Sequence, residues 1–367
     1  MIDLRSDLCT VPTDEMWDAM RSAELGWPRF GEDASLNALC ERTAELLGKA
    51  AATWVPTCGM ANLAALLVFC DPGEHVVLEA ASHVLSSEGM GITEVARLEP
   101  SPIWAADGRM DPEAVEQLVR ETRAALLVLE NTHTRAGGTV LSAESTQSLA
   151  DAAKRHGCRV HVDGARLVNA SVALGVPLAA LAAPANSVAL SLNKGLSAPF
   201  GAMLAGSEAV VERAKLVLHR LGGGTVHRAG IAAAAGLVAL ETMVDRIADD
   251  HRRARVLAER LAAVPGLALR SPAETNIVVV DVTAIGLEAG VLCRLLDEGG
   301  VRAMERDPST IRLVTHRLIG DEDVEQAAAI VAEIVERHAL SPPPLESPLY
   351  DELETFDGPE WDEDATA

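Results

Sequence analysis

Aromatic residues are scarce in this 367-residue chain, where they make up 3% of the sequence and include a single tyrosine. Hydrophobic residues still account for 49% and charged residues for 23%, which is typical of a globular protein with a sizeable core. Alanine, leucine and valine must therefore fill most of the interior. The length suits a large domain joined to a smaller one.

Basic residues are also in deficit, with 31 Lys and Arg against 54 Asp and Glu and a formal net charge of -23. A nucleic-acid partner is not expected, because a phosphate backbone is bound by an excess of Lys and Arg. Part of the acidity is local. Residues 345–367 carry nine Asp or Glu and no Lys or Arg, which predicts a solubilising and partly disordered tail.

The six cysteines show no paired spacing, the N-terminus does not resemble a signal peptide, and no apolar run is long enough to span a bilayer. These absences predict a cytoplasmic protein with reduced thiols and no membrane partner. Zinc-ligand spacings, a catalytic serine elbow and a dinucleotide fingerprint are lacking as well, so no metal site is expected.

What the chain does have is two short apolar runs that each end in a charged residue. Residues 160–162 read as a buried strand ending at Asp163, and residues 187–192 as another ending at Lys194. Both charged residues therefore lie where strands of an α/β sheet end and loops begin, which is where such folds bind ligands.

An acid and an amine placed in this way suit pyridoxal phosphate. This cofactor needs a lysine to hold its aldehyde as a Schiff base and a carboxylate to keep its ring nitrogen protonated. Taken alone, Asp163 is more often a helix cap and Lys194 a solvated loop residue. The small residues at 195–201 favour the cofactor interpretation, because a solvent-exposed lysine requires no such loop.

Three motifs carry a resemblance to a known family: VHVDGARLVNA at 160–170, KGLSAP at 194–199 and LENTH at 129–133. Together they resemble the low-specificity threonine aldolases of the β-eliminating lyase group, which are fold-type I pyridoxal phosphate enzymes. The similarity runs from Ile2 to about His338. It implies a large α/β domain with a mostly parallel sheet, a smaller C-terminal α+β domain, and a homotetramer built as a dimer of dimers.

The resemblance also implies roles at the reacting centre. Lys194 would form the Schiff base and Asp163 would pair with the ring nitrogen. The family's histidine at the position of His83 stacks on the cofactor ring, although a lone histidine there is more often structural. His133 matches a histidine near the substrate hydroxyl, and is a candidate to accept or position its proton.

The cofactor phosphate is expected at the turn Thr57, Cys58 and Gly59, between a strand and a helix that runs to Phe69, because a helix N-terminus offers free N–H groups and a positive dipole end. Relatives have glycine and then threonine at the last two positions, so the hydroxyl contact would pass to Thr57. Cys58 is either a reactive thiol with a lowered pKa or a packed, inert one.

Relatives also supply a phosphate-binding arginine from a neighbouring subunit. Their Met-Arg-Gln segment is one residue shorter than the matching segment here, so Arg228 or His227 would substitute and Arg220 would supply a further cation. A second departure is Phe30, which stands where the family usually has tyrosine.

Three residues are candidates to hold the substrate carboxylate. Arg312 lies in an otherwise apolar strand, where a charge needs a partner, and the family's matching arginine binds this carboxylate. Ser6 has the same role by resemblance. Arg166 follows Asp163 by three residues and is expected to point into the site, where it would meet the carboxylate or the ring oxygen.

Three parts of the chain are expected. Residues 1–245 form an N-terminal segment and the large cofactor-binding domain. Residues 246–340 form the small domain, and residues 341–367 form the acidic tail. One helix is expected over 169–181, before the strand that leads to Lys194. A long alanine-rich helical stretch is expected over 231–261, linking the two domains.

The leading hypothesis is an aldehyde-lyase that cleaves a β-hydroxy-α-amino acid, such as threonine or allo-threonine, to glycine and an aldehyde. The second is a related pyridoxal phosphate enzyme that catalyses β-elimination, racemisation or a transaldolase-type exchange. The third is a fold relative that has lost its cofactor and serves as a binding or scaffold protein. In the first two cases the partner is a small amino acid.

Overall fold

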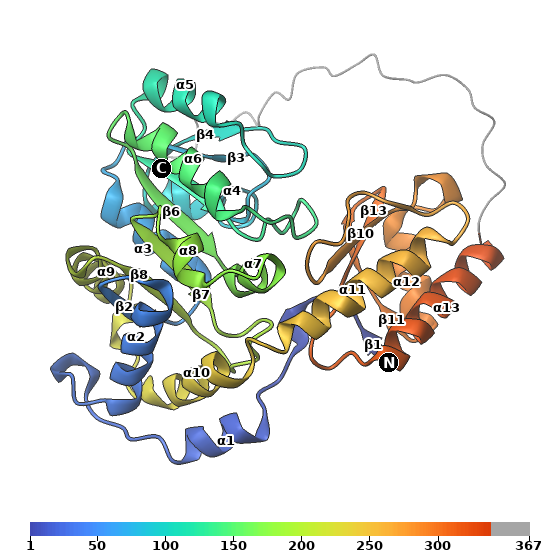
Figure 1. Ribbon diagram of the computed structural model, residues 1–367, viewed down its shortest axis with the longest axis horizontal. Helices are drawn as coiled ribbons and strands as arrows, with labels where there is room; N and C mark the ends of the chain where they lie inside the picture. Colours follow the sequence, from blue (N-terminus) through green and yellow to red (C-terminus); the bar gives the residue numbers. More distant parts are fainter. Residues whose placement is uncertain (339–367) are drawn as a thin grey trace, which may run out of the picture.

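The computed structural model describes residues 1–338. The expected acidic tail therefore lies outside the described residues. Two layers of helices enclose a central sheet, and a smaller unit with its own sheet lies beside them (Figure 1). Among the helices of residues 1–338, none combines the length and the apolar character that a membrane crossing requires.

The central sheet has seven strands, and only β8 runs against the others. Both of its faces are buried, which explains why its strands read as nearly continuous apolar runs rather than as alternating ones. In spatial order the strands are β2 (Ala51–Val55), β8 (Ala202–Gly206), β7 (Ser187–Ser191), β6 (Arg159–Gly164), β5 (Leu126–Glu130), β3 (His75–Glu79) and β4 (Glu99–Ile103).

Helices cover both faces of this sheet. The largest apolar cluster packs one face against α1 (Asp14–Arg21), α2 (Ala34–Leu47), α5 (Pro112–Thr122), α6 (Ala143–Lys154), α7 (Leu167–Leu174), α8 (Leu178–Ala182) and α10 (Gly230–Thr242). Two smaller clusters pack the other face against α3 (Cys58–Phe69), α4 (His83–Ser86), α9 (Glu208–Arg220) and the short η3 (Gly91–Val95).

The C-terminal part has an antiparallel sheet in the order β12 (Met304–Asp307), β13 (Thr310–Val314), β10 (Ile277–Asp281) and β9 (Ala268–Leu269). Its helices are α11 (Ile247–Ala262), α12 (Ala289–Glu298) and α13 (Asp321–His338), and the short helices of the chain are η1 (Asp7–Cys9), η2 (Pro28–Phe30), η4 (Gly223–Thr225) and η5 (Thr283–Ile285).

The N-terminal residues join this C-terminal part. β1 (Ile2–Asp3) pairs in parallel with β11 (Val301–Arg302), and the side chains of Ile2 and Leu4 lie in the same apolar cluster as α11 and α13. The domain boundary at residue 245 stays a prediction. The pairing shows that the first four residues pack with the smaller unit rather than with the central sheet.

Two expected helices are interrupted, and each expectation of one continuous element was wrong. The segment 169–181 divides into α7 and α8, because Gly175 ends α7 in the left-handed region (φ 64) and Pro177 cannot donate a helical hydrogen bond. The segment 231–261 divides into α10 and α11. α10 packs on α1 and α2, whereas α11 packs mostly on α13 and β10, and one straight helix could not reach both sets of partners.

The expected strands before Asp163 and Lys194 are confirmed as β6 and β7. Because parallel strands end at one edge, β3, β5 and β6 bring Glu79, Glu130 and Asp163 there together. β2 ends at the same edge and leads into α3. The loops that follow these strands carry the other candidate residues.

Candidate active site

Asp163 is buried at the end of β6, with 1% of its surface exposed, and both carboxylate oxygens accept hydrogen bonds. The Ala165 N–H donates to Oδ1 (3.1 Å), where the Cys58 thiol also donates (3.8 Å). Asn62 donates to Oδ2 (3.1 Å). Burial, with the negative charge of Glu130 beside it in register, raises the pKa of Asp163 to about 6. Burial and the neighbouring carboxylates therefore outweigh the nearby positive charges at Asp163.

Lys194 follows β7 in a loop that is fixed through its backbone. Its carbonyl oxygen accepts from the Thr10 hydroxyl and from the Ser197 N–H, both at 2.9 Å. Gly201 closes the loop at φ 106, where a side chain would collide with the indole of Trp54. Within residues 1–338 no salt bridge engages the ammonium group of Lys194.

The charge of Lys194 nevertheless acts on the site. It lowers the pKa of Asp163 and of Asp7, against the opposing effect of burial on each. Because β6 and β7 are neighbouring parallel strands, Asp163 and the loop of Lys194 lie at the same edge of the sheet. This is the arrangement on which the cofactor interpretation depends.

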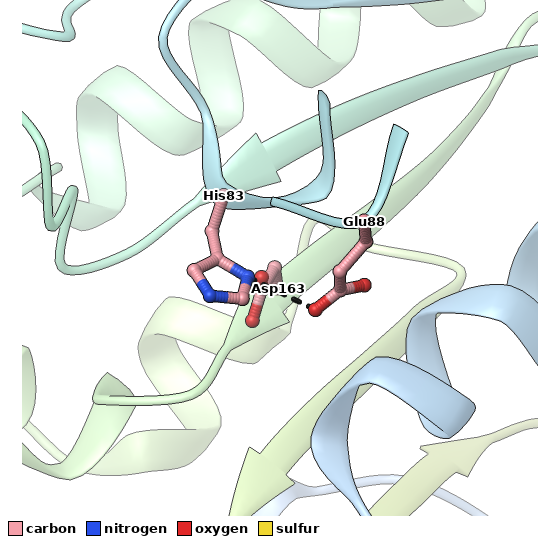
Figure 2. A group of neighbouring side chains, drawn as sticks. All are labelled: His83, Glu88 and Asp163. Atoms are coloured by element: carbon pink, nitrogen blue, oxygen red, sulfur yellow. Dashed lines mark hydrogen bonds and ion pairs between the residues drawn. The ribbon is translucent and has the colours of Figure 1, made fainter. Parts of the chain in front are cut away.

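His83 lies at the start of α4 and turns toward Asp163 (Figure 2). Its Nδ1 shares a hydrogen bond with Oε1 of Glu88 (2.9 Å), and Glu130 accepts from its backbone N–H (2.7 Å). One side-chain nitrogen or oxygen atom from each of His83, Glu88 and Asp163 lies within 4.8 Å of the other two. The bond to Glu88 raises the pKa of His83, and the side chain is still 42% exposed.

His133 reaches the same edge but is enclosed, with 2% of its surface exposed. Its Nε2 bonds Oε2 of Glu79 (2.8 Å), and Nδ1 accepts from the Ala136 N–H (3.2 Å). Both ring nitrogens are therefore engaged within the chain. The prediction that His133 accepts or positions the substrate proton finds no free nitrogen in this arrangement.

The expected phosphate turn is a well-formed helix start. Thr57 caps α3 by accepting from the Met60 N–H (3.1 Å), so its hydroxyl is used locally although the residue is exposed. A cavity of about 310 Å³ beside the turn is lined by Thr57, Gly59 and Glu88, among others. Burial and the nearby Asp163 raise the pKa of Cys58, which favours the inert thiol over the reactive one.

The glycine-rich segment that holds Arg228 lies against this turn. A side chain at Gly223 would collide with Met60 of α3, so glycine permits the contact. Beyond it, Asp33 caps α2 and also accepts from the Gly230 N–H (3.2 Å), which ties the end of the segment to α2. Arg228 itself is exposed in the left-handed region (φ 67).

Arg166 points into the site region but is largely occupied by Asp7. Its Nε and Nη2 donate to the two oxygens of Asp7, both at 2.8 Å, and Nη1 donates to Thr134 (2.9 Å). Both partners of the pair are buried. Three of the five N–H groups of Arg166 already have acceptors in the chain, so two remain for the substrate carboxylate or the ring oxygen, and that role stays a prediction.

Arg312 is the contrasting case. In the middle of β13 it donates only to the carbonyl of Arg5 (3.1 Å) and to the sulfur of Met304 (3.0 Å), and its buried Nε has no hydrogen-bond partner within residues 1–338. Burial and the nearby Arg166 lower its pKa to about 10. Ser6 lies close by in sequence to Arg5 and is 8% exposed; its hydroxyl caps η1 by accepting from Leu8 (3.2 Å).

Several functional residues were missed by the sequence interpretation. Glu88, Glu79 and Glu130 hold the two histidines, and Asn62 holds Asp163. Glutamates that end two buried strands were a usable signal, because a charge at the end of an apolar run marks the sheet edge. Glu88 and Asn62 gave no such signal, since both lie in helical or turn segments.

Comparison with known proteins identifies the family. A family model described as β-eliminating lyase matches residues 3–285. Low-specificity L-threonine aldolase 1 of Arabidopsis thaliana is 40% identical over 334 residues, covering 88% of this chain and 93% of the relative. Low specificity L-threonine aldolase of Escherichia coli (strain K12) is 36% identical over 336 residues, covering 90% and 98%. The chain therefore belongs to the β-eliminating lyase family, as the resemblance predicted.

Solved structures confirm the predicted fold class. A threonine aldolase from Leishmania major superposes with a TM-score of 0.78 at 18% identity, covering 91% of this chain and all (100%) of the other. An aspartate aminotransferase from Rhodobacter sphaeroides superposes with a TM-score of 0.71 at 18% identity, covering 92% of each chain. These likenesses show the fold.

The residues present fit pyridoxal phosphate, the cofactor predicted from the sequence and supported by the family. Asp163 has a raised pKa among further carboxylates, and a protonated ring nitrogen would place a positive charge beside it that favours the ionised form. The Lys194 amine has no salt-bridge partner within residues 1–338 and can bind an aldehyde. The start of α3 offers backbone N–H groups for the phosphate. It lies close to Asp163, because the thiol of Cys58, the first residue of α3, donates to Oδ1 of Asp163 (3.8 Å).

Proposed function

We propose that this protein is a pyridoxal phosphate-dependent aldolase that cleaves β-hydroxy-α-amino acids, including threonine and allo-threonine, to glycine and an aldehyde. The observation that carries the proposal is the placement of Lys194 and Asp163 at one sheet edge, in a chain 40% identical to a low-specificity threonine aldolase. When bound, the cofactor supplies an electron sink for the pair of electrons released from the Cα–Cβ bond.

Four groups of the chain would hold the cofactor. The Lys194 amine would bind its aldehyde, the Asp163 carboxylate would pair with its ring nitrogen, and the His83 ring would pack against it. The N–H groups at Thr57, Cys58 and Gly59 receive its phosphate, to which Arg228 contributes from a neighbouring subunit.

Arg312 would bind the substrate carboxylate. Its buried Nε and its lowered pKa both show a guanidinium that lacks an anion within residues 1–338, and a carboxylate can accept two of its N–H groups. Ser6 adds a hydroxyl donor. Arg166 fixes the position of Asp7 by donating two hydrogen bonds to it. Each terminal nitrogen of Arg166 keeps one N–H group that can donate to the substrate carboxylate.

His83 is better placed than His133 to take the proton of the β-hydroxyl group. Glu88 accepts from its Nδ1, which leaves the lone pair on Nε2 and stabilises the ring when Nε2 gains a proton. The proton passes to Nε2 directly or through one water as the Cα–Cβ bond breaks. The aldehyde leaves, and Cα gains a proton to give glycine.

We further propose a cytoplasmic homotetramer. All six cysteines are unpaired, which suits a reducing compartment. Trp27 and Phe30 pack together and are 51% and 64% exposed, an aromatic surface of the kind that subunit interfaces cover. Light scattering on the purified protein tests the assembly.

The activity is tested by incubating the purified protein and pyridoxal phosphate with L-threonine and L-allo-threonine. Glycine and acetaldehyde in equal amounts are expected. Lys194→Ala should lower kcat at least about 10⁴-fold, since it removes the group that binds the aldehyde. Ammonia with a 2-oxo acid would favour the elimination alternative, and an absence of visible cofactor absorbance would favour a non-catalytic protein.

A further inference from the structure

The face of the central sheet that α3 covers carries two apolar clusters with a polar strip between them. Ala189 of β7 belongs to one cluster and Val128 of β5 to the other. β6 lies between these strands and presents His161 and Asp163 to this face, while its valines point to the opposite face. A histidine buried here must find hydrogen-bond partners.

A continuous chain of hydrogen bonds links His161 to Asp163. His161 Nδ1 lies 2.7 Å from the Ser187 hydroxyl, its neighbour in register on β7. His161 Nε2 lies 3.0 Å from Oδ1 of Asn62, and Nδ2 of Asn62 lies 3.1 Å from Oδ2 of Asp163 and 3.3 Å from Oε2 of Glu88. At most 1% of the surface of Ser187, His161 and Asn62 is exposed.

The chemistry of these groups fixes the direction of every bond in the chain. Ionised carboxylates only accept, so the amide nitrogen of Asn62 must face Asp163 and Glu88 and its oxygen must face His161. The oxygen also only accepts, so the hydrogen of His161 is on Nε2. Nδ1 is then an acceptor, and Ser187 donates to it. All three donors therefore point toward Asp163.

We propose that Asn62 and His161 are positioning residues that hold Asp163 ionised and correctly oriented for the ring nitrogen of the cofactor. This inference rests on the proposed function, because it assumes that Asp163 meets that nitrogen. Asn62 contacts Asp163 directly and His161 acts through Asn62. Ser187 completes the chain by fixing the tautomer of His161.

The charges around Asp163 explain why it needs such support. Glu88 and Glu130 lie nearby, and burial together with Glu130 raises the pKa of Asp163 to about 6, which favours the neutral acid. A neutral acid has no negative charge with which to stabilise a protonated ring nitrogen. Donors that point at its oxygens oppose this tendency, and each bond in an aligned chain polarises the next.

His161 is suited to this task because it does not change charge. Complete burial lowers its pKa to about 3, so the ring stays neutral at any pH at which the protein works. Its Nε2 therefore remains a donor to Asn62 and Nδ1 remains an acceptor.

The test measures the dissociation constant of pyridoxal phosphate, by absorbance titration, in four variants of the full-length protein. Asn62→Leu should weaken binding about 30-fold and His161→Leu about 5-fold, because a hydrogen bond to a buried carboxylate is lost directly in the first and weakened in the second. His161→Gln keeps an N–H donor near the position of Nε2 and should bind within about 2-fold of the wild type.

His75→Leu is the matched control. His75 makes the same kind of bond to a serine on the neighbouring strand, with its Nδ1 2.9 Å from Ser101, but it lies at the opposite end of β3. Its removal should leave the dissociation constant unchanged. A change as large as that of His161→Leu would show that any lost histidine in this sheet weakens binding, and would overturn the proposal.

A second ligand separates positioning from simple structural support. In 1-deazapyridoxal phosphate a C–H group replaces the ring nitrogen, so Asp163 has nothing to pair with. The wild type and all variants should bind this analogue within about 2-fold of one another. Equal losses for both ligands would mean that Asn62 and His161 only support the fold. A His161→Gln variant that behaves like His161→Leu would mean the same.

The wild type provides the check on the proposed function itself. If it binds pyridoxal phosphate no better than the deaza analogue, Asp163 does not meet the ring nitrogen and the proposed function loses its cofactor placement. If the wild type discriminates and releases glycine, yet the variants discriminate equally well, the proposed function stands and the positioning role is refuted. Thermal midpoints of the cofactor-free variants confirm that each is folded, and His161→Gln decides the question if His161→Leu is not.

Discussion

Two sets of charged side chains meet at the carboxyl edge of the central sheet. They differ in whether another charged side chain of the protein pairs with them. In the closed set, Asp7 and Arg166 bond each other and His133 bonds Glu79. In the open set, Lys194 has no salt bridge within residues 1–338, and Arg312 has no acidic partner there. His83 also belongs to the open set, because only its Nδ1 is bonded to Glu88 and its Nε2 is left for a ligand.

The difference separates charges that are satisfied within the fold from charges that remain available to a ligand. A buried charge that is satisfied inside the chain contributes to a single native arrangement, and removing its partner is costly. A partly buried charge without an internal partner lowers stability, and is retained where a ligand supplies that partner. The closed and open sets should therefore respond oppositely to substitution.

After Lys194→Ala, the largest effect is expected at Arg312. Arg312→Leu should lower kcat/KM for threonine about 10³-fold, since the substrate carboxylate loses its cation. The free energy of unfolding should stay the same or rise by about 1 kcal/mol, because a desolvated cation is removed. Steady-state kinetics and urea titration check the two. Arg270→Leu, whose arginine pairs with Asp281, is the control, and a loss of stability at Arg312 would place that residue in the closed set.

The two histidines provide the next comparison. His83→Gln should lower kcat about 10²-fold with little change in stability, because it removes the proposed base. His133→Leu should cost about 2 kcal/mol in stability, since Glu79 loses a buried partner, and should lower kcat less than tenfold per bound cofactor. The opposite ranking of the two kcat values would restore His133 as the base.

The closed pair Asp7–Arg166 should be among the most costly to break. Arg166→Met leaves a buried carboxylate alone and should lower the free energy of unfolding by about 3 kcal/mol in urea titration. The matched control is Arg5→Met, which removes the exposed arginine of the pair with Asp3 and should have little effect. Equal effects from the two substitutions would remove the distinction between the sets.

The smallest expected effect is a pair of opposite pH dependences in the cofactor-free protein. The raised pKa of Asp163, about 6, means that its contribution to stability is full below pH 4 and is lost as the pH rises through 6. Asp7 has a pKa below its ordinary value, because Arg166 outweighs the effect of burial. Its contribution is present above pH 4 and is lost as the pH falls below it.

The measurement is the difference in free energy of unfolding between each variant and the wild type. For Asp163→Asn this difference should rise by about 2 kcal/mol between pH 4 and pH 7.5. For Asp7→Asn it should fall over the range from pH 3 to pH 5. Pyridoxal phosphate should abolish the first dependence, because the ring nitrogen lowers the pKa of Asp163. If the difference in free energy of unfolding changed with pH in the same direction for both variants, the opposite pKa shifts of Asp163 and Asp7 would be contradicted.

Much of the local structure could be predicted from the sequence. The strands that lead to Asp163 and Lys194 and the helix that runs to Phe69 follow from short-range patterns, and the structure contains them. The two broken helices were missed because helical periodicity continues across Gly175 and across residues 243–246. The local geometry of Gly175 and Pro177 causes the first break, and the packing of α10 and α11 on different partners accounts for the second.

The site was predicted less completely, and for a physical reason. Asp7 is 159 residues from Arg166, and Asn62 is 101 residues from Asp163, so no local pattern relates them. The sequence located the charges but not their partners. It therefore placed Arg166 and His133 in the reaction, whereas the fold brings each of them an acid that takes up its hydrogen bonds.

The sequence by itself determined the family and the cofactor class and singled out the two residues proposed to carry the chemistry, because these lie in contiguous motifs around strand ends. Only the tertiary structure decided which charges are satisfied within the chain and which are left for ligands. That decision rests on distances of about 3 Å between residues far apart in sequence. It also fixed the direction of the hydrogen bonds behind Asp163, since the donors and acceptors meet only after the sheet and α3 have packed.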